Sequence, residues 1–268
     1  VISQPCPVIV DYIQLYHPEL IPWLAPVDSP MMHTIKMIRE YFPQYENVKI
    51  LVVSPCYAKR HEFNECGVSC WNVTFHSFSE FIKDNGISID TYEEREFDGP
   101  HAERGVLFPI PGGLMRTAAR EVPSISNLTR KIEGKPEVYN YLFNLAAKKR
   151  AGEKPLFQLV DCLNCSRGCN FGGGTDNNGR DIDEVELRIE NLAQRNIAVQ
   201  KRHEKKFHLF SFGSKKTGSA YSALVNKYWK PGLYDRTYQN LSHIFFNEVK
   251  IPTDAEIKSV FQKMHKRT

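Results

Sequence analysis

Three cysteine-containing segments of this chain could do chemistry. They span residues 4–7, 54–59 and 162–174, and in the third Cys165 and Cys169 are separated by three residues and followed by three glycines. Thiolates drawn from distant segments are how a chain holds an iron-sulfur cluster. The glycines allow backbone N–H groups to approach the sulfurs closely and to tune the potential of a cluster. The pattern therefore favours an iron-sulfur site over a tight turn that buries cysteines incidentally.

Zinc is the other metal that four thiolates could bind. Cys162 and Cys165 form a Cys-x-x-Cys pair, which is the usual ligand spacing of structural zinc sites. Prolines flank Cys6 and precede Cys56, and their rigid backbone without N–H donors suits a dry cavity better than a small zinc knuckle. Spacing alone leaves open a zinc site built on Cys162, Cys165, Cys169 and one further ligand.

The composition is that of a globular protein able to bury a full core. The chain has 268 residues, of which 41% are hydrophobic and 25% charged, as in ordinary globular domains. No apolar run is long enough to span a membrane, and no secretory signal pattern opens the sequence. Seven cysteines without regular disulfide-like spacing are typical of metal-binding or catalytic thiols in a reduced compartment, so we expect a cytoplasmic location.

Charge is distributed unevenly along the chain. Residues 1–175 carry 18 Lys and Arg against 20 Asp and Glu, whereas residues 176–268 carry 17 against 11. The basic cluster at residues 201–206 could bind nucleic acid or an acidic redox partner. No aromatic interleaving or nucleic-acid motif accompanies these charges, so the pattern favours a solvated helix face, and nucleic-acid binding is not expected.

Apolar runs alternate with amphipathic stretches in the first 175 residues, which predicts an α/β domain with a mainly parallel sheet. Buried strands are expected at residues 48–53, 105–108 and 156–160. Cysteine segments follow the first and third of these, at the carboxyl ends where open α/β sheets bind ligands. Helices are expected at residues 7–16, 32–42, 78–84 and 138–150. A further helix is expected to begin near residue 181.

The three motifs and their order resemble the catalytic-domain family of iron-only (FeFe) hydrogenases. In that family the first motif ends in Cys-Pro, the second reads Pro-Cys-x-x-Lys-x-x-Glu, and the third is Cys-x-x-x-Cys followed by glycines. The likeness covers residues 1–175 and extends to the segments at 11–20, 29–30, 96–98, 105–108 and 112–113. It implies an α/β fold in which two lobes of mainly parallel sheet, flanked by helices, enclose a cofactor cavity. Residues 176–268 would form a basic, helical C-terminal extension that packs on this core.

The resemblance also implies a cofactor and its ligands. A 4Fe-4S cluster would be bound by Cys6, Cys56, Cys165 and Cys169. Cys169 would also bridge to a di-iron subcluster with CO, CN and a bridging dithiolate, and the two together form the H-cluster. Catalytic roles fall to Lys59, which would donate to a cyanide ligand, and to Glu62, which matches a glutamate on the family's proton route. The residues expected to line or position the cofactor are Ser29, Pro30, Ser54, Pro55, Lys59, Phe108, Gly113 and Leu163.

Several departures from the family pattern concern proton delivery. Pro5 stands where efficient members carry a second cysteine that passes protons to the cofactor, and Ala25 stands where a serine is usual. Met31 replaces a glutamine, and Ser54 and Leu163 replace methionines. Such a chain resembles the divergent, sensory branch of the family, with slow reversible turnover of dihydrogen into protons and electrons. The alternatives are a non-hydrogenase iron-sulfur protein of the same fold, acting in cluster assembly or redox regulation, and a zinc-binding interaction module.

The remaining cysteines and the partners complete the expectations. Cys66 and Cys70 form a second Cys-x-x-x-Cys without following glycines, which favours a buried thiol pair over a second cluster. Cys162 is interpreted as a thiol behind the ligands or a substitute ligand, and His61 is the histidine expected near the pocket. Electrons would pass to an electron-transfer partner or to upstream ferredoxin-like domains outside this chain.

Overall fold

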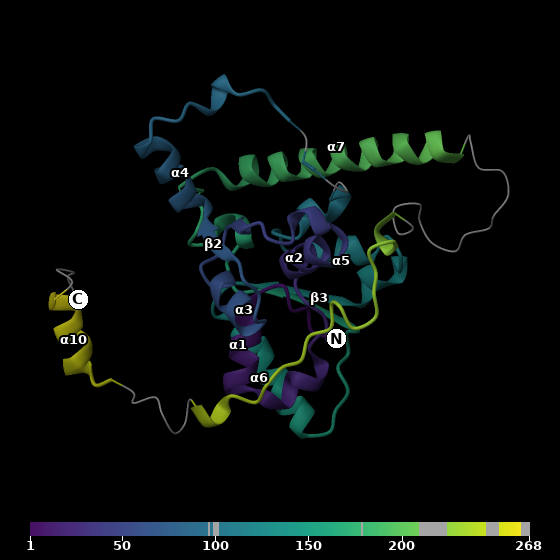
Figure 1. The fold of residues 1–268 in the computed structure, drawn as a ribbon. Coiled ribbons are helices and arrows are strands. Elements are labelled where there is room, and N and C mark those ends of the chain that lie inside the picture. The colour runs from purple at the N-terminus through teal and green to yellow at the C-terminus, as the bar shows by residue number, and fades with distance from the viewer. Residues whose placement is uncertain (96, 99–101, 178, 209–223, 245–251, 264–268) are drawn as a thin grey trace.

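The computed structural model describes residues 1–95, 97–98, 102–177, 179–208, 224–244 and 252–263. Within them the strands form two separate parallel pairs. β1 (Leu51–Ser54) pairs with β2 (Trp71–Thr74), and β3 (Thr129–Glu133) pairs with β4 (Leu159–Leu163). Helices surround both pairs (Figure 1). This arrangement confirms the expected α/β class with parallel strand pairing.

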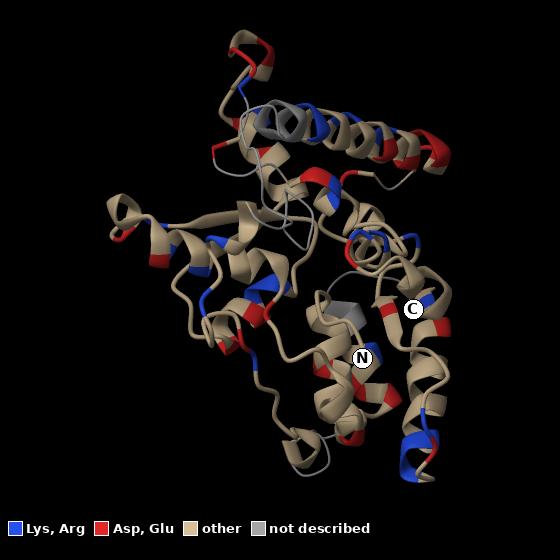
Figure 2. Ribbon diagram, turned by 90° about the vertical axis from the view of Figure 1, so that its right-hand side faces the viewer, with Lys and Arg blue, Asp and Glu red and all other residues tan. Residues whose placement is uncertain are grey.

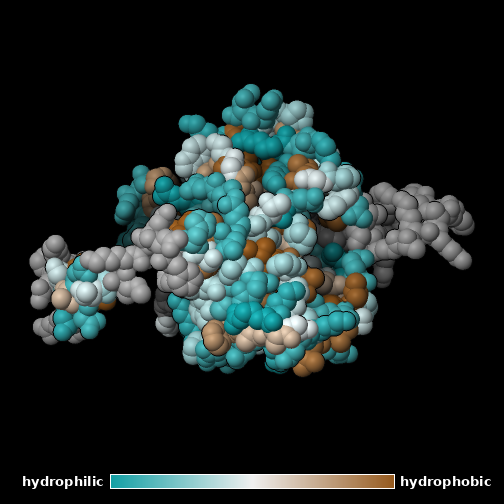
Figure 3. All heavy atoms as spheres, turned by 90° about the horizontal axis from the view of Figure 1, so that it is seen from below, coloured by the Kyte–Doolittle hydropathy of each residue, from teal (hydrophilic) through white to brown (hydrophobic). Residues whose placement is uncertain are grey.

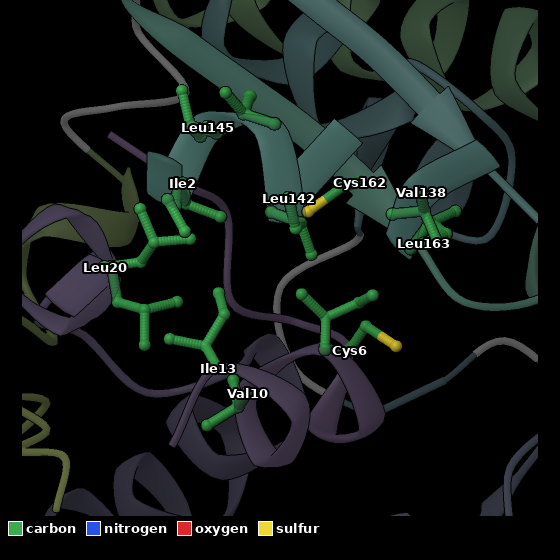
Figure 4. Packing of buried hydrophobic residues seen from close by; sticks show 14 residues of the cluster. Ile2, Cys6, Val10, Ile13, Leu20, Val138, Leu142, Leu145, Cys162 and Leu163 are labelled. Carbon is green, nitrogen blue, oxygen red and sulfur yellow. The ribbon is translucent and has the colours of Figure 1, made fainter. Parts of the chain in front are cut away.

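The larger core lies beside β4, all of whose residues are buried. Against it pack α1 (Pro7–Tyr16), the 3₁₀ helix Pro18–Trp23 and α6 (Glu137–Arg150). α1 begins directly after Cys6 because Pro7 supplies a preformed first helical residue. Figure 4 shows aliphatic side chains from these elements meeting in one cluster. The bounds of α1 are those expected from sequence, and α6 begins one residue earlier than expected.

The β1–β2 pair has a smaller core. α2 (Pro30–Tyr41) and α3 (Lys59–Glu65) contribute Met32, Ile35 and Phe63, the buried residues of this cluster. α4 (Phe75–Asp84) starts at the end of β2, where the Thr74 side chain accepts a hydrogen bond from the Ser77 backbone. A short 3₁₀ turn at Pro43–Tyr45 follows α2. Little apolar packing therefore stabilises this half of the molecule.

Residues 105–108 do not form the expected strand. They lie in the 3₁₀ helix Glu103–Leu107 and in Phe108, the residue that follows it. A 3₁₀ helix at Ile89–Thr91 precedes this one, and α5 (Gly113–Ala118) and a 3₁₀ helix at Pro123–Leu128 come after it. The Phe108 backbone N–H donates to the Gly105 carbonyl within this turn. A four-residue apolar run beside Gly105 does not distinguish a strand from a tight turn, and here the local hydrogen bonds close the turn.

Two described parts of the chain beyond residue 175 contact the preceding domain, namely α7 (Ile182–His208) and the segment around Arg236. α7 crosses the upper side of the molecule (Figure 1) and is attached to α5 by the pair Arg116–Glu190. Its first turn is acidic, and basic residues follow towards its other end (Figure 2), as the helix dipole favours. α10 (Asp254–Lys263) stands apart from the rest in Figures 1 and 3. In the described part of the chain no helix has the length and apolar character needed to cross a membrane.

Candidate iron-sulfur site

Cys6 is fixed by the segment that precedes it. Ile2 forms parallel bridges to Leu24 and Val160, and the Ser3 backbone N–H donates to the Val160 carbonyl over 2.9 Å. The chain then turns into α1, where the Cys6 carbonyl accepts from Ile9 and Val10. Cys6 is buried, and in Figure 4 its sulfur points away from the aliphatic cluster. The N-terminal segment thus delivers one thiol to the edge of the larger core.

Cys56 follows the carboxyl end of β1. The Ser54 hydroxyl donates to Asn72 Oδ1 (2.6 Å), lies 3.1 Å from the Cys56 carbonyl and accepts from the Cys56 N–H (3.3 Å). Asn72 Nδ2 donates to the same carbonyl over 3.0 Å. The buried hydroxyl of Ser54 therefore shapes the turn that carries Cys56 and ties that turn to β2.

Cys165 and Cys169 lie in the loop after β4, where two close approaches explain the glycines. Gly168 has φ 84°, and a Cβ there would meet the Pro109 carbonyl at 2.2 Å. Cys169 donates its backbone N–H to that carbonyl over 2.7 Å. A Cβ on Gly174 would lie 2.8 Å from the Pro55 carbonyl, to which its own N–H donates over 3.2 Å. The absence of side chains lets the third motif pack against the second.

The four thiols form one electrostatic group. Burial raises the pKa of Cys6 to about 11, and nearby Cys56 and Cys165 add to the effect. Burial also raises the pKa of Cys169 to about 12, with Cys6, Cys165 and Cys56 contributing and Lys59 opposing the rise. Such thiols are protonated at neutral pH without a metal, and metal binding must release their protons. The structure thus brings together all four cysteines that the sequence predicted as ligands.

The geometry of these thiols fits a cluster better than a single ion. Four sulfurs at about 2.3 Å from one zinc would lie within about 4 Å of one another. Among the described residues, no three cysteine sulfurs lie within 4.8 Å of one another. Two buried polar atoms beside the ligands, Gln4 Oε1 and Asn170 Nδ2, have no hydrogen-bond partner in the described structure. The donor set and these atoms fit a group larger than one ion.

The other three cysteines are not placed as ligands, although Cys162 is near enough to Cys6 for the Cys6 thiol to add to the rise in the pKa of Cys162. The Cys162 sulfur is buried among aliphatic side chains near Leu142 (Figure 4), and the Ser3 hydroxyl lies 3.9 Å from it. Burial raises the pKa of Cys162 above the ordinary value. Cys66 and Cys70 pack beside the smaller core around Phe63. β4 is buried along its whole length, so Cys162 lies in the core, whereas the loop after β4 carries Cys165 to the candidate site.

Lys59 and Glu62 form the centre of a buried charge network. Lys59 Nζ donates to Glu62 Oε2 over 2.6 Å and to the Pro5 carbonyl over 2.9 Å. Arg236 Nη1 donates to Glu62 Oε1 over 3.0 Å, so both carboxylate oxygens of Glu62 have a cationic partner. Arg236 was missed by sequence reasoning because it lies 174 residues from Glu62 and in no recognised motif.

The expected pocket residues lie in different surroundings. Ser29 is buried and caps α2 by accepting from the Met32 N–H, whereas Pro30 is exposed at the first turn of that helix. Gly113 begins α5 where a Cβ would meet the Leu107 carbonyl at 1.7 Å, so only glycine fits. Leu163 is buried in the larger core and Phe108 is half-buried. Ser54 and Pro55 adjoin Cys56, as described above.

His61 lies with Asp11 and Glu65, whose side chains offer ligand atoms within 4.8 Å of one another. His61 Nδ1 is 3.2 Å from Asp11 Oδ2. Protein groups already satisfy Glu65, because Gln14 donates to its Oε1 and Arg236 to its Oε2. His61 is exposed and lies beside Glu65, the carboxylate at the outer end of the charge network that contacts Arg236.

The family of the chain follows from a sequence comparison. The family described as iron only hydrogenase large subunit, C-terminal domain, matches residues 1–173. This chain belongs to that family. The match contains the candidate ligands and both residues of the Lys59–Glu62 pair, and it ends before α7 and Arg236. A comparison with curated protein sequences found no match.

Solved FeFe-hydrogenase structures share the fold. HydA1 from Chlamydomonas reinhardtii, in a variant form, aligns with a TM-score of 0.57 and 16% identity, over 90% of this chain and 76% of that one. A HydA structure that reports stepwise H-cluster assembly gives the same values. A third, concerned with oxygen inactivation through the 2Fe subcluster, gives 0.55 and 17% over 90% and 75% of the two chains. At this identity the structural alignments show that the chain shares the α/β fold of these proteins.

Proposed function

We propose that this domain binds a 4Fe-4S cluster through Cys6, Cys56, Cys165 and Cys169. The observation that carries the proposal is the convergence of four thiols from three distant segments, with the ammonium group of Lys59 close enough to oppose the pKa rise of Cys169. The spacing of the sulfurs supports a cluster over zinc. Membership of the hydrogenase family agrees with an iron-sulfur cofactor.

We further propose that the matured domain carries the complete H-cluster and reacts slowly and reversibly with dihydrogen, in a sensing role. When bound, the H-cluster supplies the redox chemistry of hydrogen activation. This chain's residues would hold the cluster, exclude water from a buried site and offer Lys59 as a donor to an anionic ligand. Pro5 has no proton to transfer, and Glu62 is paired with two cations instead of standing at the end of a relay.

Iron and infrared analysis tests this proposal. After anaerobic maturation with the di-iron subcluster, we expect six irons per chain and infrared bands of bound carbonyl and cyanide, which change when dihydrogen is added. Four irons without such bands would reject hydrogen chemistry and retain the cluster, and zinc alone would reject both. A matured chain whose bands do not respond to dihydrogen would contradict the sensing role.

The second candidate function is that of an iron-sulfur protein without the di-iron part. It is favoured by the hydrogen bonds of Lys59, which donates to Glu62 and to the Pro5 carbonyl. A lysine neutralised in this way need not bind cyanide. The discriminating measurement is infrared spectroscopy of Lys59→Met after maturation, because loss of carbonyl and cyanide bands with retention of four irons would assign Lys59 to the di-iron part.

The setting we propose is a reduced cytoplasm, where thiols stay free for iron and an electron-transfer partner or ferredoxin-like domains exchange electrons with the cluster. Support for this comes from the seven cysteines, all unpaired in the structure.

A further inference from the structure

The C-terminal segment 233–241 reaches the candidate site through one buried guanidinium. The side chain of Arg236 is 4% exposed and bridges Glu62 and Glu65, with distances of 3.0 and 2.5 Å. Glu62 is fully buried, and its second oxygen accepts from Lys59. Two cations and two carboxylates thus alternate in one chain of contacts. Its inner end is the Pro5 carbonyl, which directly precedes Cys6.

The segment around Arg236 is also attached by uncharged contacts. The Tyr238 hydroxyl donates to the Ala25 carbonyl over 2.6 Å, and the Asp28 N–H donates to the Tyr234 carbonyl over 2.9 Å. Tyr234 stacks on His33, with ring centroids 4.4 Å apart. Segment 233–241 therefore lies against the start of α2 and its preceding turn. Removing the charge of Arg236 would leave these contacts available.

The charge of the network reaches the candidate ligands. Lys59 Nζ lies 2.9 Å from the carbonyl of Pro5, the residue before Cys6, and its positive charge opposes the rise in the pKa of Cys169. Glu62 partly cancels the charge of Lys59, and Arg236 in turn partly cancels that of Glu62. With all four groups the network is neutral. Without Arg236 it has a net charge of −1, and without the Glu62 carboxylate it has a net charge of +1.

We propose that Arg236 is a positioning residue that sets the reduction potential of the iron-sulfur cluster through Glu62 and Lys59, and that cluster reduction in turn tightens the docking of segment 233–241. The inference rests on the proposed cluster. Reduction adds negative charge at the cluster, and a positive neighbourhood favours it. Because coupling between two equilibria is reciprocal, a segment whose cation favours reduction must itself be held more firmly in the reduced state.

Two neutral substitutions with opposite expected signs test the potential. In the chain reconstituted with its 4Fe-4S cluster, R236Q should lower the midpoint potential and E62Q should raise it. R236K, which keeps the charge, should stay close to the wild type. R188Q removes an arginine of α7 that is 70% exposed and, among the described residues, pairs with Glu184 of the same helix, and it should leave the potential unchanged. Shifts of the same sign in R236Q and E62Q would indicate mere loosening of the fold and would overturn the inference.

Hydrogen exchange tests the reciprocal effect. Backbone amides of residues 234–241 should exchange more slowly in the reduced than in the oxidised wild type, and R236Q should lose this difference. Equal exchange rates in both redox states of the wild type would overturn this inference but would leave the proposed iron-sulfur cluster unaffected. A wild-type chain that takes up no iron would overturn the proposed function and this inference together. If R236Q fails to fold, the rise in midpoint potential expected for E62Q still tests the inference, and a lowered potential in E62Q would overturn it.

Discussion

All five residues of β4 are buried, whereas β1 in the other strand pair runs from an exposed Leu51 to a buried Ser54. The β3–β4 half rests on a large aliphatic cluster that includes Leu142. The β1–β2 half has three fully buried apolar residues and a buried charge network around Glu62. Each half contributes candidate ligands to the proposed cluster site. Apolar packing fixes one rigidly, and charge ties the other to segment 233–241, so the second half is the one that can respond to a change of charge.

Loss of a ligand is the largest expected effect and tests whether both halves serve one cluster. Cys56→Ser and Cys165→Ser, one from each half, should each abolish the visible absorption of the reconstituted 4Fe-4S cluster, because three thiolates cannot complete the site. The matched control is Cys162→Ala, which removes a thiol in the aliphatic core and should retain the cluster. Retention in Cys165→Ser or loss in Cys162→Ala would reverse the assignment of ligands.

Truncation of core residues tests the difference in packing. Leu142→Ala should lower the free energy of unfolding of the apo chain by about 2–5 kcal/mol, the range for buried leucines. Ile35→Ala in the smaller core should fall near the lower end of that range because fewer buried neighbours surround it. Urea denaturation of both variants gives the comparison. An equal or larger loss for Ile35→Ala would show that the small core bears as much of the stability.

Ser54→Ala tests how the polar half holds its ligand. The substitution removes a buried hydroxyl that bonds the Cys56 backbone and Asn72, and it should cost about 1–3 kcal/mol through the partners left unpaired. The cluster should form but bind less tightly, measured as faster iron release to a chelator. Thr117→Ala, which removes a hydroxyl bonded within α5, serves as the control and should release iron at the wild-type rate.

The smallest expected effect concerns pH and the contact between His33 and Tyr234. Burial lowers the pKa of His33 below its ordinary 6.5. The folded chain then binds this proton less well than the unfolded chain, so the contribution of His33 to stability is present above pH 6.5 and is lost as the pH falls through the lowered pKa. His33→Gln should flatten the decline in unfolding temperature of the apo chain between about pH 7 and pH 5. An unchanged decline would show that other groups cause it.

Most local features could be predicted from the sequence. Pro7 marked the start of α1 and the glycines after Cys169 marked a loop of close approach, because single residues with restricted or permissive backbones decide such geometry locally. The run 105–108 was misjudged because four apolar residues fit a strand or a turn equally well, and the outcome depends on hydrogen-bond partners. The charge network could not be predicted at all.

By itself the sequence determined which four thiols are candidate ligands, the order of their motifs and the parallel α/β pattern, since these depend on residue type and short-range spacing. Only the tertiary structure decided which groups meet across long separations. It placed Cys162 in the aliphatic core, three residues before Cys165, and it brought Arg236 to Glu62. Burial makes such pairs obligatory, because a buried carboxylate needs a partner, but it does not say which distant residue will supply one.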